Sequence, residues 1–209
     1  MRLTKIFFLF FLGSIILSAQ SFEGFVKYKM TSDGESMFMN YYKKGENVRM
    51  EPEMEEMAGA VLFKEGKTYM LMPTQNMYME FDMEKFEDLA EETESNFKEP
   101  IKTGETKDIL GYSCEKWIFE DEEFTTEVWA AKGLGEFIFM SIPMGDQEMP
   151  SWYKDLSAGG FFPMHIIAKD KSGNDDGSME VVEIKEQSVP ASMFEIPSNY
   201  QKFSMPGMN

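Results

Sequence analysis

Short segments in which apolar and polar residues alternate occupy most of the chain. Alternation with a period of two residues predicts strands that bury one face. In residues 22–30, Gly24, Val26, Tyr28 and Met30 fall on the same side. The other segments of this kind are 36–43, 48–51, 60–63, 68–72, 77–81, 112–119, 124–131, 162–169 and 179–185. Short polar turns join most of them, which favours antiparallel pairing.

Helical patterns are few. Residues 83–95 carry Phe86, Leu89 and Ala90 at helical spacing among acidic residues, which predicts one amphipathic helix. Residues 135–157 combine apolar residues with Pro143 and Pro150, so we expect short helical pieces on a loop there. Strands outnumber helices and no linker divides the chain. We therefore predict a single, mostly β domain of the α+β class over residues 20–209.

The first 19 residues have the three parts of a secretory signal peptide. A basic start with Arg2 and Lys5 precedes an apolar run over residues 6–17, and Ser18 and Ala19 follow as small residues for cleavage. The apolar run is too short to cross a membrane comfortably. We expect an exported chain, periplasmic or secreted, with no stable membrane span.

Composition and the rare residue types narrow the function. The 37 acidic residues exceed the 20 basic ones and give a net charge of −17, which excludes nucleic-acid binding. The single cysteine, Cys114, is interpreted as a core residue, and the single histidine, His165, as a residue on a sheet face. No nucleotide-binding or hydrolase motif is present, so we predict a protein without catalytic residues, metal or cofactor. Residues 170–177 weakly resemble a calcium loop, but a hairpin turn is preferred.

The methionines show the most distinctive pattern. Three Met-x-Met pairs, at residues 37 and 39, 70 and 72, and 77 and 79, each place two thioethers on one strand face. Three interpretations stay open: a core of flexible side chains, a cavity for an apolar ligand such as an acyl chain, or a Cu(I) site. The candidate lining residues are Tyr28, Met37, Met39, Tyr41, Met70, Met72, Met77, Met79 and Phe81.

Two longer stretches resemble a known bacterial family. They are residues 103–117, followed by Glu127-Val128-Trp129, and residues 194–200 near the end. Together with residues 24–30 and 42–50, they resemble the domain of unknown function 4412 (DUF4412) family. That family looks related in fold to the lipoprotein-localisation factors LolA and LolB and to outer-membrane lipoprotein-sorting proteins.

The resemblance implies a strongly curved antiparallel sheet, an incomplete barrel, with a few short helices across its concave face. It also implies an apolar cavity between sheet and helices, which holds acyl chains in the localisation factors. In the carrier an arginine holds the lid, and Arg49 is the one arginine outside the predicted leader.

From these observations we expect an exported, monomeric, non-enzymatic binding protein with an apolar cleft for a lipid or a lipoprotein acyl chain. The alternative is an envelope interaction or sensor protein that grips a protein partner. A methionine-rich Cu(I)-binding protein is the third possibility.

Export is directly testable. If residues 1–19 are a signal peptide, N-terminal sequencing of the protein recovered from outside the cytoplasm will start at or near Gln20. Recovery of the full-length chain from the cytoplasm alone would contradict this prediction.

Overall fold

The computed structural model describes residues 22–53, 59–82, 99–120, 124–138, 156 and 158–204. Twelve strands account for most of them. The strands are β1 (Gly24–Ser32), β2 (Glu35–Lys44), β3 (Asn47–Pro52), β4 (Ala60–Lys64), β5 (Lys67–Met72), β6 (Met77–Asp82), β7 (Ile101–Ile109), β8 (Tyr112–Glu120), β9 (Phe124–Ala131), β10 (Phe162–Asp170), β11 (Asp175–Glu186) and β12 (Gln201–Lys202).

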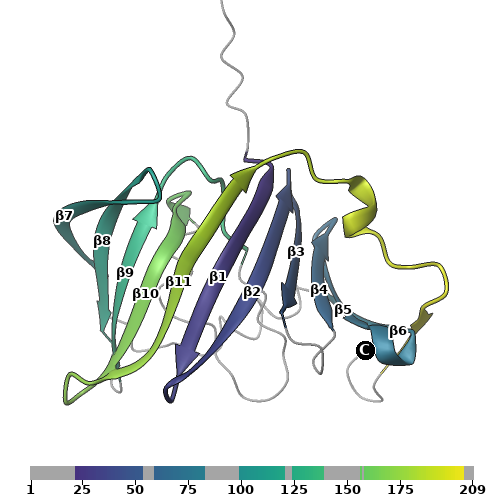
Figure 1. Ribbon diagram of the computed structural model, residues 1–209, viewed down its shortest axis with the longest axis horizontal. Helices are drawn as coiled ribbons and strands as arrows, with labels where there is room; N and C mark the ends of the chain where they lie inside the picture. The colour runs from purple at the N-terminus through teal and green to yellow at the C-terminus, as the bar shows by residue number, and fades with distance from the viewer. Residues whose placement is uncertain are drawn as a thin grey trace, which may run out of the picture.

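All the strands belong to one open, curved sheet (Figure 1). Their order is β12-β6-β5-β4-β3-β2-β1-β11-β10-β9-β8-β7. Neighbours are antiparallel apart from the short parallel pairing of β12 with β6. Because β1 lies between β2 and β11, the beginning and the later part of the chain meet in the middle of the sheet.

The structure confirms all ten strands that alternation predicts, and it adds β7 and β12. β7 lies at one edge of the sheet and is mostly exposed on both faces, so its sequence carries no alternation. The predicted helix over residues 83–95 and most of residues 135–157 lie outside the described residues. The helical elements whose bounds the structure describes are the short 3-10 turns η2 (Pro73–Gln75) and η3 (Ala191–Phe194).

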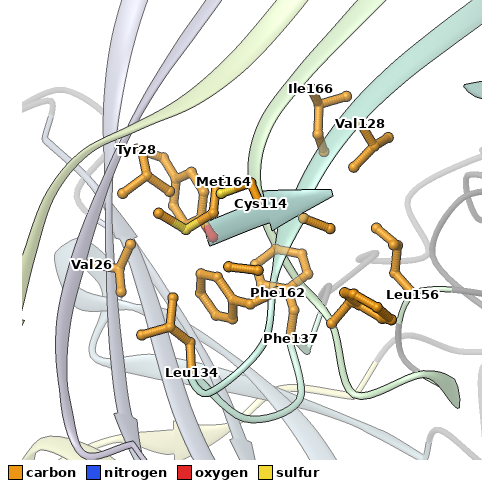
Figure 2. Close-up of a cluster of buried hydrophobic side chains, with 14 of the residues drawn as sticks. Val26, Tyr28, Cys114, Val128, Leu134, Phe137, Leu156, Phe162, Met164 and Ile166 are labelled. Carbon is orange, nitrogen blue, oxygen red and sulfur yellow. The ribbon is translucent and has the colours of Figure 1, made fainter. Parts of the chain in front are cut away.

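The two faces of the sheet have different cores. We call the face that carries Val26, Tyr28 and Tyr41 the inner face, and the opposite face the outer face. On the inner face, Tyr28 and Tyr41 pack against Phe137 and Phe162, with ring centroids 5.2–6.3 Å apart. Figure 2 shows Tyr28, Phe137 and Phe162 of this cluster together with Leu134, Leu156 and Met164. Such aromatic pairs add about 0.5–1.5 kcal/mol each to the free energy gained from burying their surface.

Polar contacts fix the chain that follows β9 against the inner face. The backbone N–H of Ile138 donates to the Tyr41 hydroxyl over 3.3 Å, and the Lys43 Nζ donates to the Glu136 carbonyl over 2.9 Å. Lys43 is only 4% exposed, and burial lowers the pKa of its ammonium group. Two different strands therefore contribute to this inner core: β2 through Tyr41 and Lys43, and β1 through Tyr28.

The outer face carries a second, smaller core beneath the C-terminal segment. Ala60, Leu62 and Leu71 are buried there, and Ile196 and Tyr200 pack against them. Figure 1 shows the yellow C-terminal segment, including η3, beside β3 to β6. The expectation of short helices across the concave face stays a prediction. η3 itself lies beside the outer face, because apolar residues alternate onto both faces of β4 and β5 and the C-terminal segment covers the outer set.

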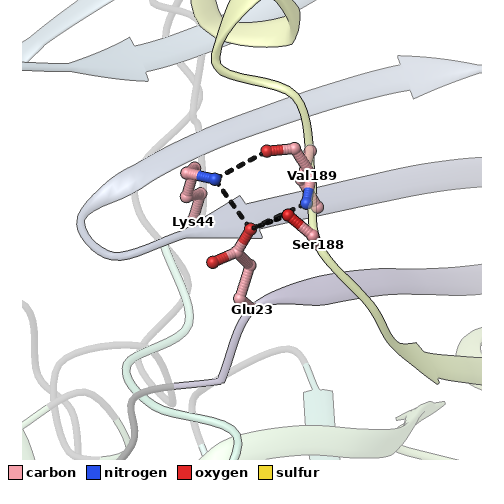
Figure 3. Close-up of polar contacts among 4 residues, drawn as sticks. All are labelled: Glu23, Lys44, Ser188 and Val189. Carbon is pink, nitrogen blue, oxygen red and sulfur yellow. Dashed lines mark hydrogen bonds and ion pairs between the residues drawn. The ribbon is translucent and has the colours of Figure 1, made fainter.

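A polar latch holds the beginning of this C-terminal segment (Figure 3). The Glu23 carboxylate accepts hydrogen bonds from Lys44 at 2.8 Å, from the Val189 backbone N–H at 2.7 Å and from the Ser188 hydroxyl at 3.3 Å. Lys44 also donates to the Val189 carbonyl over 2.8 Å. The Lys44 hydrogen bond is the largest cause of the lowered pKa of Glu23.

Gly24 provides a stability test of the sheet centre. A Cβ at Gly24 would clash with the Lys185 carbonyl oxygen, whereas a Cβ at Gly177 would lie at an ordinary 3.4 Å from the Thr31 carbonyl oxygen. We expect Gly24→Ala to lower the free energy of unfolding by about 1–3 kcal/mol. Gly177→Ala, the matched control, should leave it unchanged or raise it by a few tenths. Urea unfolding measures both, and equal stabilities of the two variants would refute the proposed close approach.

Candidate functional site

The inner face continues beyond the aromatic core as a surface of methionines. Strand register places Met30 opposite both Met37 and Met179, Met70 opposite Met79, and Met72 opposite Met77. Side chains opposite each other in this way share a face and lie in contact range. We call the whole set the methionine face: Met30, Met37, Met39, Met50, Met70, Met72, Met77, Met79 and Met179.

Strand register places all the predicted lining residues, including the three Met-x-Met pairs, on the inner face. Their burial divides them into two groups. Tyr28, Tyr41, Met79 and Phe81 are buried, at 7% exposure or less. Met37, Met39, Met70, Met72 and Met77 keep part of their surface exposed. Contact between these residues and a ligand stays a prediction.

Several residues of this surface are not among the lining residues predicted from the sequence. Met50 on β3 lies opposite Tyr41 and Val61, and Val61 in turn lies opposite Met70. Phe63 faces the same way, two residues after Val61. Met179 could not be recognised from local patterning, because it joins the surface through pairing with a strand about 150 residues earlier. Met30 could have been included, since it alternates in step with Tyr28.

The chemistry of this surface is apolar. Among the residues that the structure describes, no three His, Cys, Asp or Glu side chains form a group suited to a metal ion. The one buried polar side chain within it is Thr68, which is 1% exposed and lies between Phe63 and Phe81 across the neighbouring strands. Its hydroxyl has no hydrogen-bond partner among the described residues. A methionine-rich wall of this kind suits an apolar molecule of variable shape.

The two residues best able to act as nucleophile or base lie away from this surface. Cys114 is buried, its Sγ donates to the Tyr112 carbonyl over 3.3 Å, and burial raises the pKa of the thiol to about 11. His165 lies on the outer face, opposite Trp129 and Glu180. Burial, followed by the charge of Lys107, lowers the pKa of His165. The expectations of a shielded thiol and of a histidine on a sheet face are confirmed.

The segment that weakly resembles a calcium loop and the single arginine outside the predicted leader both have structural roles. Residues 170–174 form the turn between β10 and β11, where the Asp170 carboxylate accepts from the backbone N–H groups of Ser172 and Asn174, both at 2.8 Å. Arg49 lies on the outer face, with its Nε donating to Glu51 over 2.7 Å and its Nη1 donating to the Met193 carbonyl over 3.2 Å. Arg49 thus fastens the C-terminal segment to the outer face and does not reach the methionine face.

Two hollows formed by described residues lie on other surfaces. One, of about 450 Å³, lies between the tip of the β7–β8 hairpin and the end of β11. The other, of about 400 Å³, lies between His165 and the turns at residues 31–34 and 175–178.

The family profile described as Domain of unknown function (DUF4412) matches residues 22–200, which include every described strand except β12. The chain belongs to the DUF4412 family. None of the curated proteins matches the sequence of this family member.

Solved structures with the same fold come from distant proteins. This DUF4412 chain is similar to an uncharacterised conserved protein of Thermus thermophilus, with a TM-score of 0.56 and 11% identity over 88% of this chain and 91% of the other. It is also similar to PNGF-II, with a TM-score of 0.53 and 13% identity over 88% of this chain and 31% of the other. At these identities the likeness establishes the fold.

A third similar structure is the MucA/MucB complex of Pseudomonas aeruginosa. The TM-score is 0.51 and the identity 8%, over 90% of this chain and 60% of the other. The DUF4412 chain spans less than two thirds of the matched chain in both this structure and PNGF-II. A putative outer membrane lipoprotein-sorting protein domain from Vibrio parahaemolyticus is also among the similar structures, with a TM-score of 0.34.

No helix in the described part of the chain is long and apolar enough to cross a membrane.

Thiol labelling tests the inert character of Cys114. Because the Sγ is buried and its pKa is about 11, we expect the native protein to react with a thiol reagent at pH 8 at least about a hundredfold more slowly than a free cysteine peptide. The same protein in urea is the control and should react at the peptide rate. Rapid labelling of the native state would contradict the burial of this thiol.

Proposed function

We propose that this protein is an exported, non-enzymatic binding protein of the cell envelope, and that it holds an apolar ligand such as an acyl chain against its methionine face. The observation that carries the proposal is the gathering of nine methionines from six strands on one face of one continuous sheet. These methionines lie far apart in the sequence, from Met30 to Met179. A local preference for helix or strand therefore does not explain why they gather on one face.

The physical basis is the adaptability of methionine. Its unbranched side chain changes shape at little cost and offers a polarizable sulfur, so a methionine wall accepts chains of varied length and kink. Removing each ligand methylene from water contributes about 0.8 kcal/mol, so ten methylenes supply about 8 kcal/mol before the cost of association is subtracted. No charged group on the protein is needed for binding of this strength.

The buried Thr68 hydroxyl supports a ligand that is apolar but not purely hydrocarbon. It lies on the inner face beside the methionine face, and no described residue gives it a hydrogen-bond partner. An unpartnered buried hydroxyl is unfavourable, and a carbonyl or ester oxygen of a ligand inserted between Phe63 and Phe81 would relieve it. Acyl esters carry such an acceptor next to their hydrocarbon chain.

A protein partner is the second candidate ligand for the same surface. The likeness to MucB, whose structure was solved together with MucA, supports it, because it shows that this fold occurs in a complex between proteins. Absence of enzymatic activity is part of the proposal in either case. It is supported by the burial of Cys114 and by the separation of His165 from the methionine face.

Matched substitutions on β5 and β6 distinguish the candidate ligands. Replacing Met70, Met72, Met77 and Met79 together by leucine keeps apolar volume and removes every sulfur from these two strands, at a cost of less than about 1.5 kcal/mol per site. We expect the affinity for a fluorescent fatty acid, measured by titration, to stay within about threefold of the parent value. Replacing Met70, Met72 and Met77 by glutamine should weaken it at least tenfold, because the polar amides oppose an acyl chain.

Met193→Gln is the control, since Met193 belongs to η3 beside the outer face. It should leave the affinity unchanged. If the parent binds Cu(I) and the leucine variant does not, the ligand is the metal. If the parent binds neither fatty acid nor Cu(I), the apolar-ligand proposal fails and a protein partner takes its place.

A further inference from the structure

The sheet contains a gap beside the second half of β11. Pairing between β10 and β11 stops at His165 opposite Glu180. Residues 181–186 continue as a strand and pair with β1 on one side. Within the described part of the chain, no strand pairs with their other side. Among the described residues, this side of β11 is therefore an open strand edge, although β11 itself lies in the interior of the strand order.

The cause of the gap is the beginning of β10. The register with β9 shifts between Pro163 and His165, and a proline has no backbone N–H to offer a neighbouring strand. The Pro163 carbonyl accepts from the Tyr28 hydroxyl over 3.2 Å. Phe162 and Met164 are fully buried in the inner core. The residues around Pro163 therefore pack into the inner core and do not extend the backbone pairing with β11.

A hollow of about 450 Å³ lies along this open edge. Its walls come from the tip of the β7–β8 hairpin and from the end of β11, and its lining residues are Leu110, Tyr112, Val182, Glu183, Ile184 and Glu186. Two of them, Leu110 and Val182, are large apolar residues with 51% and 38% of their surface exposed. The Tyr112 hydroxyl donates to Glu186 over 3.1 Å and ties the hairpin to β11.

Leu110 is an unusual residue for its position. It has φ +54° at the hairpin tip, next to Gly111 with φ +87°. Two-residue hairpin turns with this geometry prefer Asn or Asp before Gly, and an L-residue with a bulky side chain is disfavoured there by about 1 kcal/mol. Leucine also gains little from burial here, because half of its surface is exposed. Folding alone therefore gives no reason for a leucine at this position.

We propose that the open edge of β11 is a strand-addition site for an extended, basic segment of a partner protein. The segment pairs with residues 181–186 and seats an apolar side chain between Leu110 and Val182. Lysine or arginine side chains of the segment lie beside Glu183 and Glu186. Unpaired strand edges are natural templates for such addition, with main-chain hydrogen bonds giving affinity and side-chain pockets giving specificity.

The negative charge around the hollow favours a cationic peptide over a second copy of this chain or an anionic lipid. The carboxylates of Glu183 and Glu186 border it, and the whole chain carries a net charge of −17. Glu183 is paired with Lys185 at the surface, an interaction too weak to prevent it from attracting a second cation. A second copy of this chain would bring a charge of the same sign, and an anionic lipid headgroup would be repelled in the same way. A cationic peptide is attracted.

The probe for the experiment is a fluorescein-labelled ten-residue peptide in which lysine and valine alternate, with a glutamate–valine peptide as its counterpart. We expect saturable binding of the lysine peptide by the purified chain, weakened by added salt, and at least tenfold weaker binding of the glutamate peptide. Hydrogen exchange read by mass spectrometry should show new protection of the backbone amides of residues 181–186 when the lysine peptide is bound.

Leu110→Asn is the decisive variant, because asparagine suits the left-handed turn and should keep or raise the stability of the hairpin. It should weaken peptide binding at least tenfold, and Val182→Lys should do the same by placing a cation on the edge. Ile101→Asn is the matched control. Ile101 is 52% exposed on β7 and does not line the hollow, so this change should leave binding unaltered.

The proposal would be overturned by absence of saturable binding, by equal binding of the two peptides, by unchanged binding of Leu110→Asn, or by binding without protection of residues 181–186. Sedimentation of the parent chain as a dimer that Val182→Lys dissociates would also overturn it, because the occupant would then be a second copy.

Discussion

The packing of Tyr28 and Tyr41 against Phe137 and Phe162 is the contact on which the rest of the structure depends. These four rings join β1 and β2, in the middle of the sheet, to β10 and to the chain after β9. Both tyrosine hydroxyls are used, one to hold the Pro163 carbonyl and one to accept from the Ile138 N–H. This one buried cluster thus holds the chain after β9 against the inner face and fixes the point at which β10 stops pairing with β11.

Both candidate binding surfaces follow from that cluster. Toward β6, the aromatic residues of the inner face give way to methionines, whose side chains are more adaptable. On the β10 side, Phe162 and Met164 are buried in the core, and one side of the second half of β11 has no paired strand in the described part of the chain. The outer face is closed separately, by the C-terminal segment that Glu23, Lys44 and Arg49 hold in place.

Sequence patterns predicted much of the sheet, because most strands bury one face and alternate accordingly. They did not predict β7, because both faces of this edge strand are exposed and its residues do not alternate. They also did not predict η3, because its place on the outer face depends on the second core around Leu62. Strand geometry alone places the two methionines of each Met-x-Met pair on one face. The common face of the three pairs depends on the register between strands, which local patterns do not give. The contribution of Met179 could not be predicted, because only long-range register brings it opposite Met30. The gap beside β11 was equally hidden, since it depends on Pro163 and Tyr28 meeting across 135 residues.

The central claim is that the methionine face contacts an apolar ligand. It is tested most directly by labelling the methionine methyl groups with carbon-13 and titrating the protein with a fatty acid, while NMR follows each methyl resonance. The account predicts saturable shifts of Met70, Met72 and Met77, with the Met193 methyl beside the outer face unaffected. Unchanged resonances on β5 and β6, or shifts confined to Met193, would contradict it.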